Sequence, residues 1–206
     1  MSYFPMFVEL KGKNCLVAGG GKVALRKVNV LKEFGAQIQV IAPEILPEIQ
    51  KIEGVICTKR CLEQKDLEER ELVIAATDHA EQNHRISQFC KKHRIFVNAV
   101  DQPEDCSFIF PAYLKEGEVV AAFSSGGQSP VITQYLKAQV HPIVTSYLGE
   151  MASCLGALRQ RVKQCTESEE ARKKIYQEIL QLGLERDTIP SEEEIEKVIQ
   201  KYKIMD

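Results

Sequence analysis

Short apolar runs alternate with helical patterns over the first hundred residues of the chain. The apolar runs predict five β-strands, at residues 15–18, 38–41, 55–59, 72–76 and 95–100. Apolar positions repeat at helical spacing from Ala24 through Val28 to Leu31, and a second helix is expected from about Glu81 to His93. Because the strands are apolar throughout, both faces of their sheet should be covered. The pattern predicts an α/β fold, a Rossmann-type doubly wound parallel sheet.

A different pattern follows this alternation. Two β-like runs, at residues 107–114 and 119–123, flank a short polar stretch, which is typical of a β-hairpin. A polar loop at 124–130 then leads into a helix from about Val131. We therefore expect a small α+β region after the sheet.

The remainder of the chain has helical periodicity. Ser191 and Glu194 have the spacing of a capping box and should open the last helix. The change from strand–helix alternation to a hairpin places the main domain boundary near residue 112, and a softer boundary is expected near residue 150. The fold should therefore end in a C-terminal helical segment.

The composition is that of an ordinary globular protein. Of the 206 residues, 44% are apolar and 27% are charged. The formal net charge is -2, which argues against a surface built to bind nucleic acid. No stretch is long and apolar enough to span a bilayer, and the first residues lack the pattern of a signal peptide. A cytoplasmic protein is expected.

Seven cysteines are scattered along the chain, and none forms a C-x-x-C pair. An odd number of dispersed thiols is typical of reduced, mostly buried cysteines. Cys57 and Cys61 could be combined with His79 in a metal site, but the spacing fits no standard zinc motif. We therefore expect no metal site.

A glycine-rich turn follows the first expected strand. Residues 19–24 read GGGKVA and fit G-x-G-x-x-A, between a strand and a helix. In this motif Gly19 permits the tight turn, Gly21 lets a pyrophosphate approach the backbone, and Ala24 lets the helix pack closely on the strand. The phosphates would lie at the helix N-terminus. The turn predicts dinucleotide binding, and a plain tight turn is the alternative.

The second expected strand lacks the usual ribose-binding carboxylate. That position falls near Ile41, whereas Glu44 lies slightly beyond it, after Pro43, and could reach the adenosine ribose from the loop. No arginine follows this strand closely, so a 2′-phosphate has no evident partner. NAD is therefore favoured over NADP as the cofactor.

Polar residues follow the fourth and fifth expected strands, where ligands bind in this architecture. Thr77 and Asp78 should lie close to the nicotinamide half of the cofactor. After the fifth strand, Asn98 is a further candidate for binding the cofactor, and it leads to Asp101, the best-placed carboxylate for proton transfer. An aspartate at a strand end can equally form a turn or a helix cap, so both roles stay open. His84 is expected on a solvated helix face.

The polar loop before the third helix contains Ser124, Ser125, Gly126 and Gly127. Such a sequence can form a nest of backbone N–H groups that binds anions, here the carboxylates of a substrate. A flexible interdomain linker is the alternative.

Several motifs come in an order that resembles one known family. They are FPMFVEL at 4–10, VAGGGKVA at 17–24, RK at 26–27, AATD at 75–78, NAVD at 98–101, SFIFP at 107–111 and SSGGQSP at 124–130. Together they closely resemble precorrin-2 dehydrogenases, including the N-terminal module of the multifunctional siroheme synthases. The match covers about residues 1–140, and the tail after 150 resembles the family only in general character.

The resemblance implies NAD-dependent oxidation of precorrin-2, a tetrapyrrole, to sirohydrochlorin, in the biosynthesis of siroheme, by a homodimer. It assigns the residues after about 112 to dimerisation and substrate binding. With the boundaries given above, residues 1–112 are expected to bind NAD, 113–150 to serve dimerisation and substrate, and 151–206 to form a helical C-terminal domain. The aspartate of the N-x-V-D motif is the family's catalytic residue, and it falls on Asp101. Some members also insert iron into sirohydrochlorin, so a ferrochelatase activity is left open. We expect no methyltransferase module.

Other positions of the family carry over one by one. Lys22, Val23 and the stretch from Pro43 match positions that contact NAD, and Ser125 matches a serine in the substrate region. Because the substrate carries many carboxylates, basic partners are expected, and the candidates are Arg26, Lys27 and Lys115. The rival functions are an NAD-sensing regulatory domain without catalysis and another oxidoreductase on the same fold.

Overall fold

The computed structural model describes residues 3–203. The chain divides into two compact units, Met1–Phe110 and Pro111–Asp206, each with its own helices and sheet. The expected boundary near residue 150 falls inside a helix, Ser146–Ala157, of the second unit. None of the described helices is long and apolar enough to cross a membrane.

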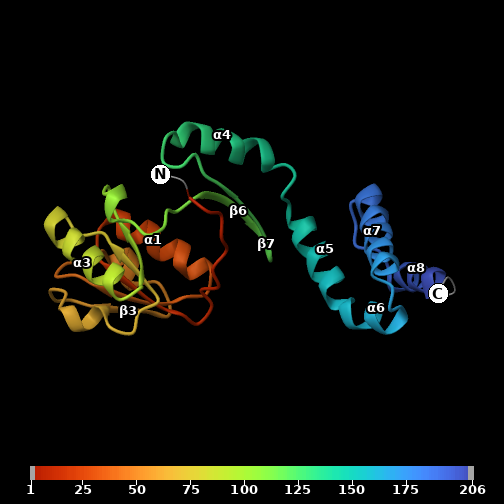
Figure 1. The fold of residues 1–206 in the computed structure, drawn as a ribbon, viewed down its shortest axis with the longest axis horizontal. Helices are drawn as coiled ribbons and strands as arrows, with labels where there is room; N and C mark the ends of the chain where they lie inside the picture. Colours follow the sequence, from red (N-terminus) through yellow and green to blue (C-terminus); the bar gives the residue numbers. More distant parts are fainter. Residues whose placement is uncertain (1–2, 204–206) are drawn as a thin grey trace. The chain divides into compact units, whose positions relative to one another are not determined.

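A five-stranded parallel sheet forms the centre of the first unit, as the sequence predicts (Figure 1). Its strand order is β3-β2-β1-β4-β5, which is the doubly wound arrangement. The strands are β1 (Asn14–Ala18), β2 (Gln37–Ile41), β3 (Val55–Thr58), β4 (Leu72–Ala75) and β5 (Phe96–Ala99). Ala18 pairs with Ile41 on one side and with Ala75 on the other, so the carboxyl ends of three strands meet at one edge.

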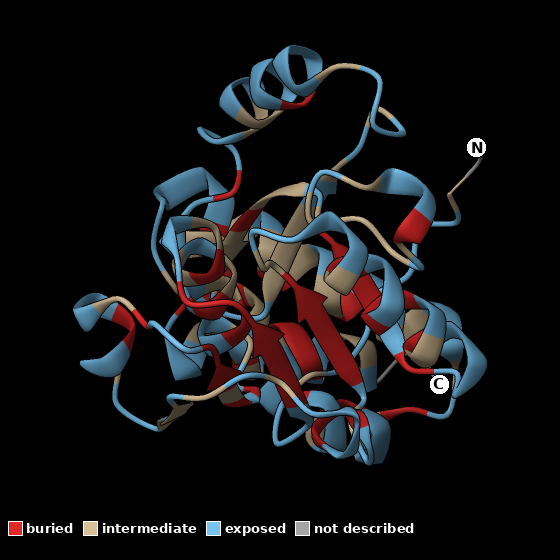
Figure 2. Ribbon diagram, turned by 90° about the vertical axis from the view of Figure 1, so that its left-hand side faces the viewer, coloured by how far each residue is buried: buried red, intermediate tan, exposed pale blue. Residues whose placement is uncertain are grey.

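Each face of this sheet packs against its own hydrophobic core. In β1, Cys15 and Val17 belong to one core, whereas Leu16 and Ala18 belong to the other. Successive side chains of a strand point to opposite faces, so a strand buried on both faces must be apolar at every position. Figure 2 shows the central strands coloured as buried.

The helices of the first unit complete these two layers. They are α1 (Lys22–Glu33), α2 (Pro47–Gln50) and α3 (Ala80–Lys92), with short 3₁₀ turns η1 (Gln64–Leu67) and η2 (Pro103–Asp105). The predicted apolar face of α1 is confirmed, because Ala24, Val28 and Leu31 are its buried residues. Gly35 follows this helix with a φ of +74°, a conformation that favours glycine.

The second unit begins with the predicted hairpin, but its first strand is shorter than expected. Strand β6 (Ala112–Glu116) pairs antiparallel with β7 (Val119–Phe123), so the expected start at Ser107 is wrong. Residues before Ala112 are held by the first unit instead. The Ser107 N–H donates to the Val97 carbonyl oxygen at 2.8 Å, and Phe108 packs against a core of the sheet.

The remainder of the second unit is helical, as predicted. Its helices are α4 (Pro130–Val140), α5 (Ser146–Ala157), α6 (Arg159–Cys165), α7 (Glu169–Arg186) and α8 (Glu192–Lys203). A third core joins the last of these helices through Val162, Ile179 and Val198. The capping box is confirmed, because the Ser191 N–H donates to the Glu194 carboxylate and the Glu194 N–H donates to Ser191 Oγ.

Candidate functional site

The three glycines between β1 and α1 have different surroundings. Gly19 has a φ of +123°, and a Cβ added to it would lie 2.1 Å from the Ala76 carbonyl oxygen. A Cβ on Gly20 would lie 2.0 Å from the Glu44 carbonyl oxygen. By contrast, a Cβ on Gly21 would meet nothing within 4 Å. Gly19 and Gly20 therefore allow neighbouring loops to pack closely, whereas Gly21 faces open space.

A cleft of about 600 Å³ lies beside this turn, at the carboxyl ends of the strands. Six of the residues expected to bind the cofactor line it: Gly19, Gly21, Pro43, Glu44, Thr77 and Asp78. Lys22 and Val23 open α1 directly after Gly21, but they are not among the lining residues. Four loops, each following a different strand from β1 to β4, thus form one cleft.

The N-terminus of α1 borders this cleft, and no acidic side chain of the helix occupies it. Gly21 is the N-cap residue and offers no side-chain hydrogen bond, and the first turn contains no acidic residue. The first N–H groups of a helix have no partner within the helix. They therefore remain available for an anion, which the helix dipole also favours.

Thr77 is held in place by Asn83, a residue that the sequence reasoning missed. The Thr77 N–H donates to Asn83 Oδ1 at 3.1 Å, and the Asn83 amide donates to the Thr77 carbonyl oxygen at 3.0 Å. Asn83 is buried although it is polar. A signal was present, because Asn83 lies at helical spacing from Ile86 and Cys90, on the buried face of α3.

Asp101 lies outside the lining of the cleft, in the turn after β5. Its φ is +60°, and its side chain is exposed. The predicted cofactor residue Asn98 precedes it and is buried, with its amide donating to the Phe108 carbonyl oxygen at 3.0 Å. The Asn98 amide is therefore engaged within the fold, whereas the Asp101 carboxylate faces solvent.

Hydrogen bonds from α3 hold the turn that carries Asp101. The carboxylate of Asp105 is buried and accepts a hydrogen bond from His84 Nδ1 at 2.8 Å. Ser87 Oγ donates to the Asp105 carbonyl oxygen at 2.5 Å. The expectation that His84 lies on a solvated helix face is confirmed, and His84 in addition pairs with a buried carboxylate.

The serine- and glycine-rich loop before α4 lies in the second unit and is closed by its own side chains. Ser129 caps α4, and the Ser129 N–H donates to Ser125 Oγ at 2.9 Å. The Gly126 N–H donates to Ser124 Oγ at 3.0 Å. Gly126 and Gly127 have φ values of +65° and +84°, with no atom near the position of an added Cβ. The loop is thus ordered by its own hydrogen bonds, which already engage the N–H groups of Gly126 and Ser129.

The predicted basic residues differ in their surroundings. Lys27 Nζ lies 3.7 Å from the centre of the Phe110 ring, and burial lowers the pKa of its ammonium group. Lys27 therefore has a partner within the first unit, whereas Arg26 is exposed on α1. Lys115 lies in β6 of the second unit. Within residues 3–203, no group of three or more His, Cys, Asp or Glu side chains is placed to hold a metal ion.

Comparison with known proteins finds a matching family model and curated relatives. A family model described as putative NAD(P)-binding matches residues 6–112. The chain is 36% identical to the siroheme synthase of Thioalkalivibrio sulfidiphilus over 184 residues, which is 88% of this chain and 38% of that protein. It is 39% identical to the siroheme synthase of Nitrosospira multiformis over 188 residues, 88% of this chain and 40% of that protein. The chain therefore spans about 40% of the length of these curated relatives.

A solved structure has the same fold over almost the whole chain. It is that of SirC, a precorrin-2 dehydrogenase, with a TM-score of 0.71 and 22% sequence identity. The match covers 98% of this chain and 99% of that one. The similarity includes both units.

Proposed function

The chain belongs to the family of putative NAD(P)-binding proteins, and from this premise we propose that it oxidises precorrin-2 to sirohydrochlorin with NAD. The observation that carries the proposal is the cleft walled by the glycine turn, on a chain that is 36–39% identical to siroheme synthases. The overall reaction converts precorrin-2 and NAD⁺ into sirohydrochlorin, NADH and a proton.

The residues of the cleft fit a dinucleotide. The space beside Gly21 leaves room for a pyrophosphate against the backbone, and the unpaired N–H groups of α1 would hydrogen bond to its oxygens. Lys22 adds a positive charge at this end of the helix. Glu44 would accept hydrogen bonds from the hydroxyl groups of the adenosine ribose, and Thr77 would border the nicotinamide half. Bound NAD supplies the hydride acceptor of the reaction.

Asp101 is the proposed catalytic base. Dehydrogenation removes a hydride and a proton from the substrate, and the carboxylate of Asp101 would accept the proton. Its exposed position at the carboxyl end of β5 leaves it accessible to a substrate. His84 and Asp105 would keep the turn in position without contacting the substrate.

The substrate carboxylates would bind to the loop before α4. Gly126 and Gly127 have no neighbouring atoms where a side chain would project, so an anion can approach their backbone. Ser124 and Ser125 shape the loop by hydrogen bonds, and Arg26 is an exposed basic group on the cofactor-binding unit. A regulatory NAD-sensing domain would not require such a loop.

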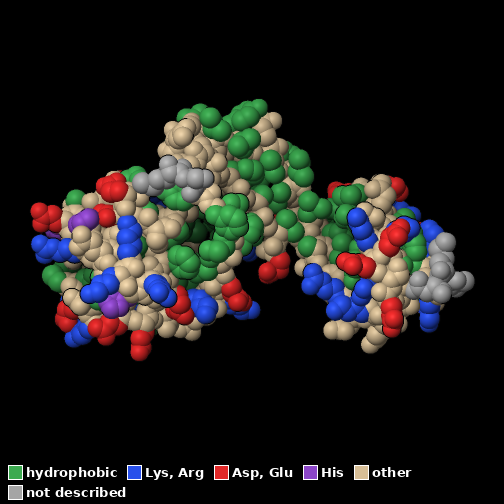
Figure 3. Space-filling model, viewed as in Figure 1, with side chains coloured by type: hydrophobic (Ala, Val, Ile, Leu, Met, Phe, Trp, Pro, Cys, Tyr) green, Lys and Arg blue, Asp and Glu red, His purple; other side chains and the backbone are tan. Residues whose placement is uncertain are grey.

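The second unit carries an exposed apolar face that we assign to a homodimer. On α4, Val131 is 78% exposed, Tyr135 is 61% exposed and Ile132 is 55% exposed. Figure 3 shows hydrophobic side chains gathered over this helix. An exposed apolar patch of this kind is typical of an interaction surface. A Tyr135→Glu variant should lower the molar mass measured by light scattering from that of a dimer to that of a monomer.

The catalytic assignment is tested with Asp101→Ala. This variant should stay folded, with a lower unfolding temperature because alanine disfavours the φ of +60° at this position. It should bind NAD with wild-type affinity, yet lose NADH formation from precorrin-2 by about a hundredfold or more. The matched control is Glu104→Ala, which removes an exposed carboxylate of η2 outside the cleft and should leave the rate unchanged. Wild-type rates in Asp101→Ala would refute the role of Asp101. The same preparations, given sirohydrochlorin and Fe²⁺, decide whether the chain also inserts iron.

A further inference from the structure

One wall of the cleft comes from a loop that the sequence reasoning passed over. Cys61 and Leu62, which follow β3, line the cleft beside the loop after β2. Strand β3 lies on the far side of β2 from the glycine turn, at the edge of the sheet. In doubly wound folds the first three strands bind the adenosine half of a dinucleotide. Cys61 and Leu62 therefore border the adenosine end of the cleft.

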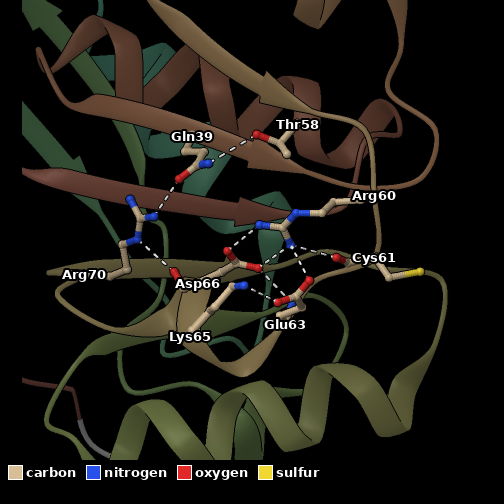
Figure 4. Close-up of polar contacts among 8 residues, drawn as sticks. All are labelled: Gln39, Thr58, Arg60, Cys61, Glu63, Lys65, Asp66 and Arg70. Atoms are coloured by element: carbon tan, nitrogen blue, oxygen red, sulfur yellow. Dashed lines mark hydrogen bonds and ion pairs between the residues drawn. The ribbon is translucent and has the colours of Figure 1, made fainter.

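The conformation of this loop depends on Arg60 and Asp66 (Figure 4). Arg60 donates from both terminal nitrogens to the Asp66 carboxylate, at 2.6 and 2.7 Å. Arg60 Nη1 also donates to the carbonyl oxygen of Cys61 at 2.9 Å. The Glu63 N–H donates to the same carboxylate at 2.8 Å. The pair thus holds the residues on both sides of Leu62, Cys61 through Arg60 and Glu63 through Asp66.

A second set of contacts joins this pair to the sheet (Figure 4). The carbonyl oxygen of Asp66 accepts from Arg70 Nε at 2.9 Å, and Arg70 Nη2 donates to Gln39 Oε1 in β2 at 2.6 Å. Gln39 in turn donates to Thr58 Oγ1 at the end of β3. The Asp66 side chain is only 8% exposed, and its pairing with Arg60 lowers its pKa to about 2. The loop is therefore anchored to the two strands whose ends form this part of the cleft.

Arg60 is also the type of residue that could bind a 2′-phosphate. A guanidinium pairs with a phosphate through two parallel hydrogen bonds, and its terminal nitrogens are the best placed to make them. Both terminal nitrogens of Arg60 are engaged by Asp66, 2.6 to 2.7 Å away. An arginine is thus present near the adenosine end but is already paired.

We propose that the Arg60–Asp66 pair determines which dinucleotide this cleft binds, by holding Cys61 and Leu62 against the adenosine half and by withholding the Arg60 guanidinium from a 2′-phosphate. The pair is a positioning and specificity element, and neither residue takes part in the chemical step. This inference rests on the proposed dinucleotide site. It explains how a cleft with a nearby arginine selects NAD.

Calorimetric titration of the full chain with NAD⁺ and with NADP⁺ tests the proposal without any tetrapyrrole. In Asp66→Asn the guanidinium loses the carboxylate that engages both terminal nitrogens and keeps only the longer ion pair with Glu63, at 3.9 Å. The affinity for NAD⁺ should therefore fall about tenfold, and the ratio of NADP⁺ to NAD⁺ affinity should rise about tenfold. In Arg60→Met the wall is loosened but no guanidinium is released. That variant should lose NAD⁺ affinity by a similar factor with an unchanged ratio.

Two further variants separate this role from a general loss of structure. Lys65→Met removes an exposed lysine that pairs only with Glu63 in this network, and it should bind both dinucleotides as the wild type does. Asp66→Glu keeps the negative charge and should restore the preference for NAD⁺. A thermal melt of each variant shows whether it is folded, and Arg60→Met retains the hydrogen bond from the Glu63 N–H to Asp66.

The outcomes are distinguishable. Unchanged NAD⁺ affinity in Arg60→Met, or a ratio that rises equally in Arg60→Met and Asp66→Asn, overturns the inference and leaves the proposed function standing. A wild-type chain that binds neither NAD⁺ nor NADP⁺ overturns the proposed function, and this inference with it.

Discussion

Substitution of each glycine in the turn by alanine should separate packing from cofactor binding. Gly19 and Gly20 face backbone atoms, with an added Cβ only 2.1 and 2.0 Å from the carbonyl oxygens of Ala76 and Glu44. Gly21 faces open space within the same turn. We therefore expect Gly19→Ala to damage the fold and Gly21→Ala to damage only the site.

The sizes of these effects follow from the geometry. Gly19 has a φ of +123°, so alanine there adds backbone strain to the contact with Ala76, and the free energy of unfolding should fall by about 3 kcal/mol or more. Gly21 has an extended conformation that alanine tolerates, with a φ of -89°. Its stability change should lie within about 1 kcal/mol, because alanine is a poorer N-cap but restricts the unfolded chain.

The effect of Gly21→Ala on the cofactor should be much larger than its effect on stability. A methyl group at this position occupies the space proposed for the pyrophosphate and would displace at least one charge-assisted hydrogen bond. Such a bond contributes about 1.5–3 kcal/mol, so the dissociation constant for NAD should rise tenfold or more.

Urea unfolding and calorimetric titration of NAD⁺ measure the two effects on the same samples. Gly20→Ala serves as the matched control, because it should resemble Gly19→Ala in stability. The reasoning is refuted if Gly21→Ala binds NAD⁺ as tightly as the wild type, or if it loses as much stability as Gly19→Ala.

Three further predictions concern side-chain pairs and the apolar helix. His84→Ala should lower kcat for precorrin-2 oxidation about tenfold without changing the KM for NAD, because it removes the hydrogen bond that holds Asp105 and the turn that carries Asp101. Steady-state kinetics in which the KM for NAD rises as much as kcat falls would contradict this. Folding lowers the pKa of Asp66 from 3.8 to about 2. The Arg60–Asp66 pair therefore contributes its full stabilisation above about pH 3.8, and this contribution is lost as the pH falls towards 2. Asp66→Asn should therefore lower the unfolding free energy by about 1–2 kcal/mol at neutral pH, and the difference should narrow towards pH 2 in urea titrations. Tyr135→Glu should give a monomer that still binds NAD⁺, and a variant that remains a dimer would exclude α4 from the interface.

Local patterns in the sequence were sufficient for the sheet and its first helix. The strands are buried on both faces, so their apolar runs stand out, and the buried stripe of α1 from Ala24 to Leu31 has regular helical spacing. The hairpin was predicted too, but its first strand was extended to Ser107. The hydrogen bond between Ser107 and Val97 joins residues that are too far apart for a local sequence pattern to reveal it.

The side chains that support the site were harder to predict for the same reason. Arg60 and Asp66 lie in a polar stretch without periodicity, and only the fold brings both terminal nitrogens of Arg60 to one carboxylate. His84 is an exposed residue on the surface of α3, and its buried partner Asp105 lies 21 positions away. Glycine spacing and strand ends locate a cleft, whereas the pairs that hold its walls depend on tertiary contacts.

Hydride transfer from precorrin-2 to NAD⁺ is the reaction that we propose for this chain. Anaerobic incubation of the purified chain with precorrin-2 and NAD⁺, with NADH absorbance and the sirohydrochlorin spectrum followed together, measures it directly. NADH and sirohydrochlorin should form at equal rates and in equal amounts. Sirohydrochlorin without NADH, or neither product from a folded chain that binds NAD⁺, would contradict it.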